Sequence, residues 1–72
     1  MHTFNPGDRV RFTKGPLGLV DLRDTSHFVE RTVGVGDEGT VSRLVSNLDG
    51  WLYVDVGDEL YCPVHPHLIE RV

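Results

Sequence analysis

A cysteine and two histidines near the C-terminal end of the sequence have a spacing that could hold a metal ion. Cys62, His65 and His67 form the pattern C-x2-H-x-H, and thiolate and imidazole groups are the ligands that Zn²⁺ prefers. A closed structural zinc site needs four ligands, whereas this motif supplies three. We therefore interpret Cys62 as a core thiol beside surface histidines, and we expect neither a metal nor any other cofactor.

Aromatic side chains in a second segment have the spacing of a binding surface. Between residues 51 and 56, aliphatic residues alternate with Trp51, Tyr53 and Asp55. Because Asp55 favours water, we expect the aliphatic face to be buried and the Trp51/Tyr53 face to be more exposed. Exposed aromatic rings on a strand could grip a peptide or stack on bases. The alternative is that both rings pack beneath the segment 14–35.

Basic side chains form a short stripe near the N-terminal end. Arg9, Arg11 and Lys14 could contact phosphate groups, which makes nucleic acid a candidate partner. The net charge is −4, however, and residues 35–72 carry two basic and seven acidic side chains. A surface of this charge opposes non-specific binding to nucleic acid. We therefore favour a solvated face on which these cations pair with acids of neighbouring strands.

The sequence lacks the patterns of an enzyme. No serine, and not Cys62, has a histidine at a diagnostic spacing, and there is no phosphate-binding glycine loop. A small barrel also has a filled interior. The single cysteine excludes an internal disulfide, and no apolar run approaches the roughly 20 residues of a membrane span. We predict a non-catalytic, soluble protein of the cytoplasm.

Three Gly-Asp pairs indicate how the chain is organised. They occupy positions 7–8, 36–37 and 57–58, each beside an apolar, strand-like run. Glycine reaches positive φ without a steric clash, and aspartate can accept a hydrogen bond from the backbone two residues on. Tight turns separated by short strands predict one small antiparallel barrel that spans residues 1–72.

Five strands follow from the alternation of apolar and polar residues. We expect them over residues 8–13, 36–45, 51–56, 59–64 and 68–72, with a hairpin turn over 46–50 and a 3₁₀-like turn over 65–67. The long segment 14–35 is predicted to be a loop. Its residues Asp24 to Ser26 suit a helix N-cap, followed by about one helical turn. A distorted hairpin is the alternative.

Parts of the chain resemble an SH3-like barrel of the KOW type. The resemblance rests on residues 4–12, on Lys14-Gly15-Pro16-Leu17, on residues 36–41 and on the ending 63–72. It is closest to the C-terminal KOW domain of NusG-like transcription factors and weaker to the small barrel of nitrile hydratase β subunits. The resemblance implies a five-stranded barrel that serves as an interaction module.

From these observations we predict a small bacterial or phage accessory protein that binds a protein partner with a basic or apolar patch. The residues expected to contact this partner are Phe28, Trp51, Tyr53, Asp55 and Glu59. Two alternatives stay open. One is a KOW-like module that contacts nucleic acid through the basic stripe, and the other is a homo-oligomeric structural subunit in which exposed strand edges pair.

Overall fold

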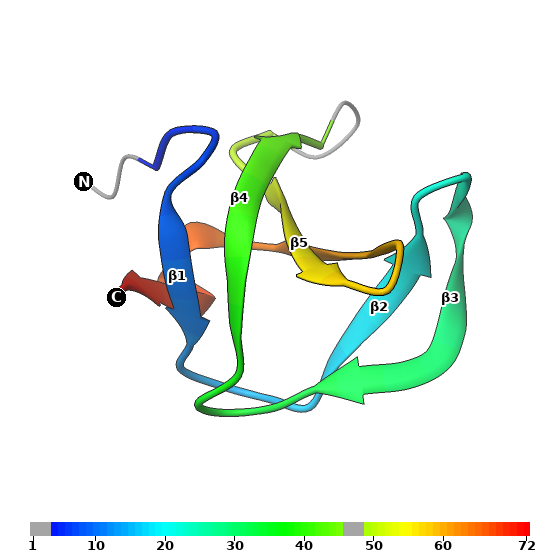
Figure 1. Ribbon diagram of the computed structural model, residues 1–72, viewed down its shortest axis with the longest axis horizontal. Coiled ribbons are helices and arrows are strands. Elements are labelled where there is room, and N and C mark those ends of the chain that lie inside the picture. The colour runs from blue at the N-terminus through cyan, green and yellow to red at the C-terminus, as the bar shows by residue number, and fades with distance from the viewer. Residues whose placement is uncertain (1–3, 46–48) are drawn as a thin grey trace.

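The computed structural model describes residues 4–45 and 49–72, which form a single antiparallel β-sheet (Figure 1). No α-helix occurs among these residues. In chain order, the elements are β1 (Arg9–Phe12), β2 (Leu17–Asp21), β3 (Asp24–Val33), β4 (Glu38–Leu44), β5 (Leu52–Gly57), β6 (Leu60–Val64), the 3₁₀-helix η1 (Pro66–Leu68) and β7 (Ile69–Arg71). The predicted all-β class and the predicted 3₁₀ turn before the last strand are both confirmed.

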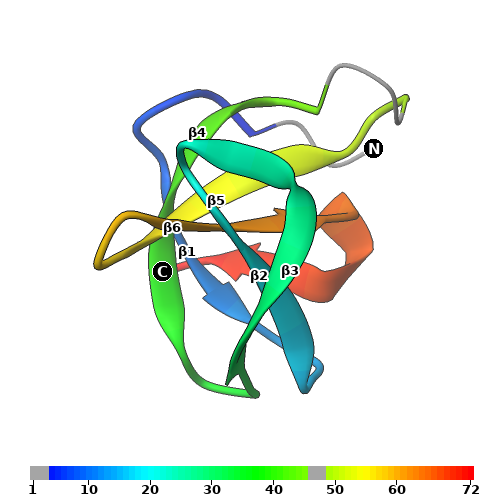
Figure 2. The same cartoon turned by 90° about the vertical axis from the view of Figure 1, so that its right-hand side faces the viewer.

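The seven strands lie in the order β3-β2-β6-β5-β4-β1-β7. The sheet bends strongly, so that the β2–β3 hairpin and the β1–β7 pair stand on opposite sides of the molecule (Figures 1 and 2). Five strands were expected and seven lie within residues 4–45 and 49–72, because the segment 14–35 contains the additional hairpin. The predicted turn over 46–50 falls mostly on residues 46–48, which lie outside the described residues.

The helical turn predicted after Asp24 is wrong, and the alternative of a distorted hairpin is correct. Asp24 Oδ1 does accept a hydrogen bond from the Ser26 amide at 3.1 Å, as an N-cap would. The chain nevertheless stays extended, because β3 pairs with β2 and places Phe28 opposite Val20. Two register shifts interrupt this pairing. Pairing with β2 therefore overrides the local helix signal.

Alternating aliphatic residues fill the interior of the bent sheet, as predicted. Val10, Phe12, Val54, Cys62 and Val64 are fully buried in one cluster. The rest of the buried cluster comes from the six strands β2 to β7 and consists of Leu19, Val33, Val41, Leu52, Leu60 and Ile69. Burial of these side chains is the main term that stabilises the fold.

The Gly-Asp turns have the expected backbone but a different hydrogen bond. Gly7, Gly36 and Gly57 have φ values of 96°, 93° and 89°. The carboxylates of Asp8 and Asp37 accept from the backbone amide three residues earlier, at 2.8 Å in both turns, rather than from a later residue. The two turns are thus built alike, and each directly precedes a strand, β1 or β4.

Strands β4 and β5 approach each other closely at Gly39. An added Cβ at this position would lie 2.5 Å from Val54 Cγ1 and 2.7 Å from the backbone oxygen of Asp55. Residue 39 therefore has no room for a side chain, and only glycine permits this close approach of the two backbones.

The two edges of the sheet are poorly suited to pairing with a second copy. Edge strand β3 is interrupted by two register shifts, and edge strand β7 has only three residues. Bulges and short strands are devices by which sheets avoid edge-to-edge pairing. These features weigh against the homo-oligomer alternative.

Candidate interaction surface

A second, smaller cluster lies on the side of the sheet opposite the core. Val20, Val45 and Tyr53 are buried in it, and Trp51 and Tyr61 pack against them. Strand pairing places Phe28 beside Val20, Val20 beside Tyr61, and Tyr61 beside Asp55, across β3, β2, β6 and β5. Since directly opposed residues share a face, these side chains form one row. We call this side of the sheet the outer face.

The two aromatic residues predicted to be exposed are largely covered. Tyr53 is only 9% exposed, so the expectation of an exposed ring is wrong for this residue. Its ring packs against that of Tyr61, with centroids 5.3 Å apart, and Val20 from the segment 14–35 joins the same cluster. Trp51 is half-buried and meets His65 edge-on at 6.0 Å. The alternative, in which these rings pack against the segment 14–35, describes Tyr53 better.

Arg43 covers the tyrosine pair from the solvent side. Its guanidinium carbon lies 5.4 Å from the ring centroid of Tyr53 and 5.8 Å from that of Tyr61. A cation in this position is held by the electron-rich ring faces. Among the described residues Arg43 forms no ion pair, whereas every other arginine faces a carboxylate. Those paired arginines are Arg9, Arg11, Arg23, Arg31 and Arg71.

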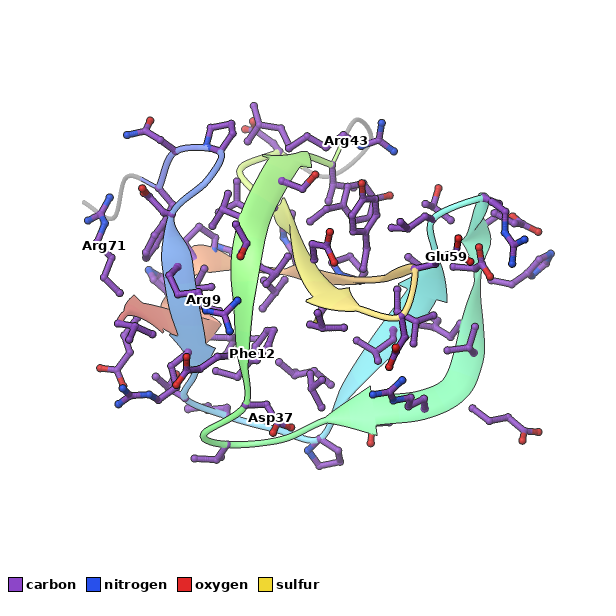
Figure 3. The ribbon with its side chains drawn as sticks, viewed as in Figure 1. Arg9, Phe12, Asp37, Arg43, Glu59 and Arg71 are labelled. Carbon is purple, nitrogen blue, oxygen red and sulfur yellow. The ribbon has the colours of Figure 1, made fainter. Side chains whose placement is uncertain are left out.

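A concavity of about 280 Å³ opens beside this arginine. Its lining comes from Thr25 at the start of β3, Arg43 and Leu44 at the end of β4, and Tyr53 in β5. Leu44 is 67% exposed. Figure 3 shows Arg43 at the end of β4 that lies farthest from Asp37. The site therefore combines an exposed leucine, a tyrosine ring, a threonine hydroxyl and one cation.

The remaining predicted contact residues divide into two places. Phe28 is 69% exposed and covers Gly18 of β2, whose added Cβ would lie 2.7 Å from Phe28 Cδ1. Asp55 is half-buried, and its carboxylate accepts from the Gly57 amide at 2.9 Å. Glu59 instead lies in the turn between β5 and β6, 3.8 Å from Arg23 and well apart from Arg43 (Figure 3). Phe28, Trp51, Tyr53 and Asp55 thus share the outer face, and Glu59 does not.

The basic stripe is largely neutralised by neighbouring strands. Arg9 pairs with Glu38 at 3.6 Å and donates to Thr40 Oγ1 at 3.2 Å, while Arg11 lies 4.0 Å from Glu70. Lys14 is exposed and forms no ion pair with the described residues. These cross-strand pairs are the arrangement that the sequence favoured over a phosphate-binding surface.

The cysteine of the metal motif is buried in the core, whereas the two histidines lie closer to the surface. Cys62 is fully buried, and this burial raises the pKa of its thiol to about 12. His65 and His67 have ring centroids 4.4 Å apart, and His65 Nδ1 accepts from the His67 amide at 3.2 Å. Within residues 4–45 and 49–72, no three histidine, cysteine or acidic side chains are grouped so as to hold a metal ion. The thiol is therefore neither an exposed ligand nor an available nucleophile.

Sequence reasoning missed four residues of this surface. Tyr61 could have been found, because it alternates with the inward residues Leu60 and Cys62. Thr25 lies in the segment for which the helical turn was preferred. Arg43 and Leu44 follow a register shift in the β4–β5 pairing, so both are exposed although they are adjacent. A shift of this kind leaves no signal in the alternation of residues.

No family model, curated protein or solved structure matches this chain. Among the described residues, no helix is long and apolar enough to cross a membrane.

Proposed function

We propose that this chain is a non-catalytic interaction module that binds a protein partner through its outer face. The observation that supports this most strongly is the concavity beside Arg43, where the exposed Leu44 meets the covered ring of Tyr53. The energetic hot spots of protein interfaces are enriched in tyrosine, tryptophan and arginine, which lie in pockets that exclude water. Phe28 extends the same face with a second exposed apolar side chain.

A protein partner fits this surface better than nucleic acid does. The chain carries a net charge of −4, and Arg9 and Arg11 are already paired with carboxylates. A phosphate backbone would have to compete with Glu38 and Glu70 for these cations. The nucleic-acid alternative predicts an affinity that falls steeply with salt, and a titration with a short thymidine oligonucleotide checks it.

We further propose that the bent sheet is an elaborated SH3-like barrel of the KOW type, in a cytoplasmic accessory protein. Five of the strands, β6, β5, β4, β1 and β7, are consecutive neighbours in the sheet. They correspond to the five strands that the sequence pattern predicted. The β2–β3 hairpin is inserted after the first of them, and η1 precedes the last. This order supports the resemblance that residues 4–12 and 63–72 carry.

Affinity capture with a matched pair of variants tests the proposed function. Leu44→Ser removes an exposed apolar group from the rim of the concavity. Val35→Ser removes an equally exposed one, 72% accessible, from the turn at the other end of β4. Both substitutions should change the free energy of unfolding by less than about 0.5 kcal/mol, because neither side chain is buried.

We expect one or more proteins to be captured by the wild-type chain and by Val35→Ser but to be lost with Leu44→Ser. Urea denaturation of each variant confirms that the bait is folded. If the captured proteins are the same for all three baits, the outer face is not the interaction surface and the proposal fails.

A further inference from the structure

We propose that the partner places an aspartate or glutamate side chain on Arg43 and a neighbouring apolar side chain in the concavity. This inference rests on the proposed function and specifies the chemistry of its partner. A docking segment of this kind has an acidic residue that contacts Arg43 and a neighbouring apolar residue that enters the concavity. The charge, the surroundings and the size of the site all favour such a segment.

The charge at Arg43 lacks a counter-ion within the described chain. Five other arginines pair with carboxylates, in a chain with eleven acidic and seven basic residues. Arg43 is the exception although acidic groups outnumber basic ones. Its guanidinium is the only charged group among the described residues that line the concavity. A carboxylate brought by a partner would provide the missing ion pair.

The rings beneath Arg43 prepare it for such a contact. Tyr53 and Tyr61 lie on one side of the guanidinium, at 5.4 and 5.8 Å, and restrict where this long side chain can point. An arginine that is already oriented loses less side-chain entropy when it binds a carboxylate. Its donors are arranged in a planar fork that matches the two carboxylate oxygens.

The size and lining of the concavity favour a short side-chain anchor. A volume of about 280 Å³ is at the lower end of small-molecule sites. Leu44 and Tyr53 supply apolar contacts, and Thr25 supplies a hydroxyl. A single cation also suits one carboxylate better than a run of phosphates, which would meet a chain of net charge −4.

Two capped pentapeptides test the inference with the complete chain. One is acetyl-Gly-Leu-Glu-Leu-Gly-amide, and the other has glutamine in place of glutamate. Each is titrated into the ¹⁵N-labelled protein while the Leu44 amide and the Arg43 side-chain resonances are followed. We expect the glutamate peptide to bind about three- to fivefold more tightly, as for a partly exposed ion pair, and the preference to shrink between about 0.05 and 0.5 M salt.

Two variants separate the local ion pair from the overall charge. Arg43→Gln should abolish the preference for the glutamate peptide. Arg31→Gln removes the same charge from an arginine that is paired with Asp58 at 2.8 Å, and it should leave the preference unchanged. If both variants reduce the preference equally, the effect is long-range charge and the inference is overturned. If Arg43→Gln is not folded, Arg31→Gln decides: a preference that this variant reduces overturns the inference, and a preference that it leaves unchanged supports it.

Other outcomes would overturn the carboxylate without removing the interaction surface. Equal binding of both peptides, or no response to either, shows that Arg43 does not select a carboxylate. A response to a thymidine oligonucleotide but not to the glutamate peptide shows that the anion is phosphate. In the first two cases the proposed function is judged separately, by the comparison of Leu44→Ser with Val35→Ser.

Discussion

Gly39 marks the place where the packing of two strands leaves no space for a Cβ atom. Gly39→Ala would place this atom 2.5 Å from Val54 Cγ1 and 2.7 Å from the Asp55 backbone oxygen. The backbone oxygen cannot rotate away, and Val54 is fully buried in the core. Strand β4 must therefore move away from β5, or β5 must shift with its neighbours.

The expected cost follows from these contacts. Overpacking of a well-packed core costs about 1–3 kcal/mol, and a clash with backbone belongs near the upper end. The loss of flexibility in the unfolded chain returns about 0.4–1 kcal/mol. We expect a net loss of about 2 kcal/mol from a total free energy of unfolding of roughly 4–11 kcal/mol. This corresponds to a decrease in Tm of about 8–16 °C for a domain of this size.

Urea denaturation followed by the fluorescence of Trp51 measures this loss, and two further glycines provide controls. Gly34→Ala introduces a Cβ with no atom within 4 Å, so it should be neutral or slightly stabilising. Gly18→Ala meets Phe28 at 2.7 Å, but this ring is 69% exposed and can turn aside, so the loss should stay below about 1 kcal/mol. If Gly39→Ala unfolds at the same urea concentration as Gly34→Ala, the reasoning about the β4–β5 contact is wrong.

Two further predictions concern the turns. The Asn5 amide and then Arg71 hold the pKa of the Asp8 carboxyl below its usual value, so the stabilisation from this group is present above its unfolded-state pKa and lost as pH falls through the folded-state pKa. Asp8→Asn should therefore make urea stability less dependent on pH below about pH 4, and an unchanged pH profile would contradict the role of this carboxylate. Glu59 has a φ of 60°, a conformation that costs other residues about 1 kcal/mol more than glycine, so Glu59→Gly should raise the free energy of unfolding by about 0.5 kcal/mol. A decrease in the urea midpoint would show that the exposed contact of Glu59 with Arg23 outweighs the backbone term.

Much of the core could be predicted because successive side chains of a strand point to opposite faces, whatever the neighbouring strands are. Val10 and Phe12 point inward together, and so do Leu60, Cys62 and Val64. The positive φ of Gly7 and Gly36 was predictable for the same reason, since each turn is set by a few adjacent residues.

The β2–β3 hairpin was harder to predict because its local signal favours two structures. Asp24 forms the side-chain hydrogen bond to Ser26 that an N-cap requires, yet the residues beyond it are extended. The choice between helix and strand is made by pairing with Val20 of β2, eight residues before Phe28, which lies outside the few residues of the capping signal. Local propensity is only a weak guide where pairing of this kind competes with it.

The candidate site was only partly predictable, because its side chains come from separate strands. Trp51 and Tyr53 were assigned to one face correctly. Because Asp55 shares this face and favours water, the face was expected to be exposed to solvent. In the structure, Tyr61 of β6 and Arg43 of β4 cover Tyr53. Whether Tyr53 is covered depends on which strands lie beside β5 in the sheet. The alternation of residues within β5 does not show this.

The buried position of Cys62 makes its thiol a reporter of opening of the core. A thiol that is fully enclosed, with a pKa raised to about 12, cannot react with an alkylating reagent while the surrounding strands stay together. Because the sequence holds one cysteine, each labelled molecule records a single opening event. The rate of labelling in plain buffer therefore reports how readily the interior opens, without added denaturant.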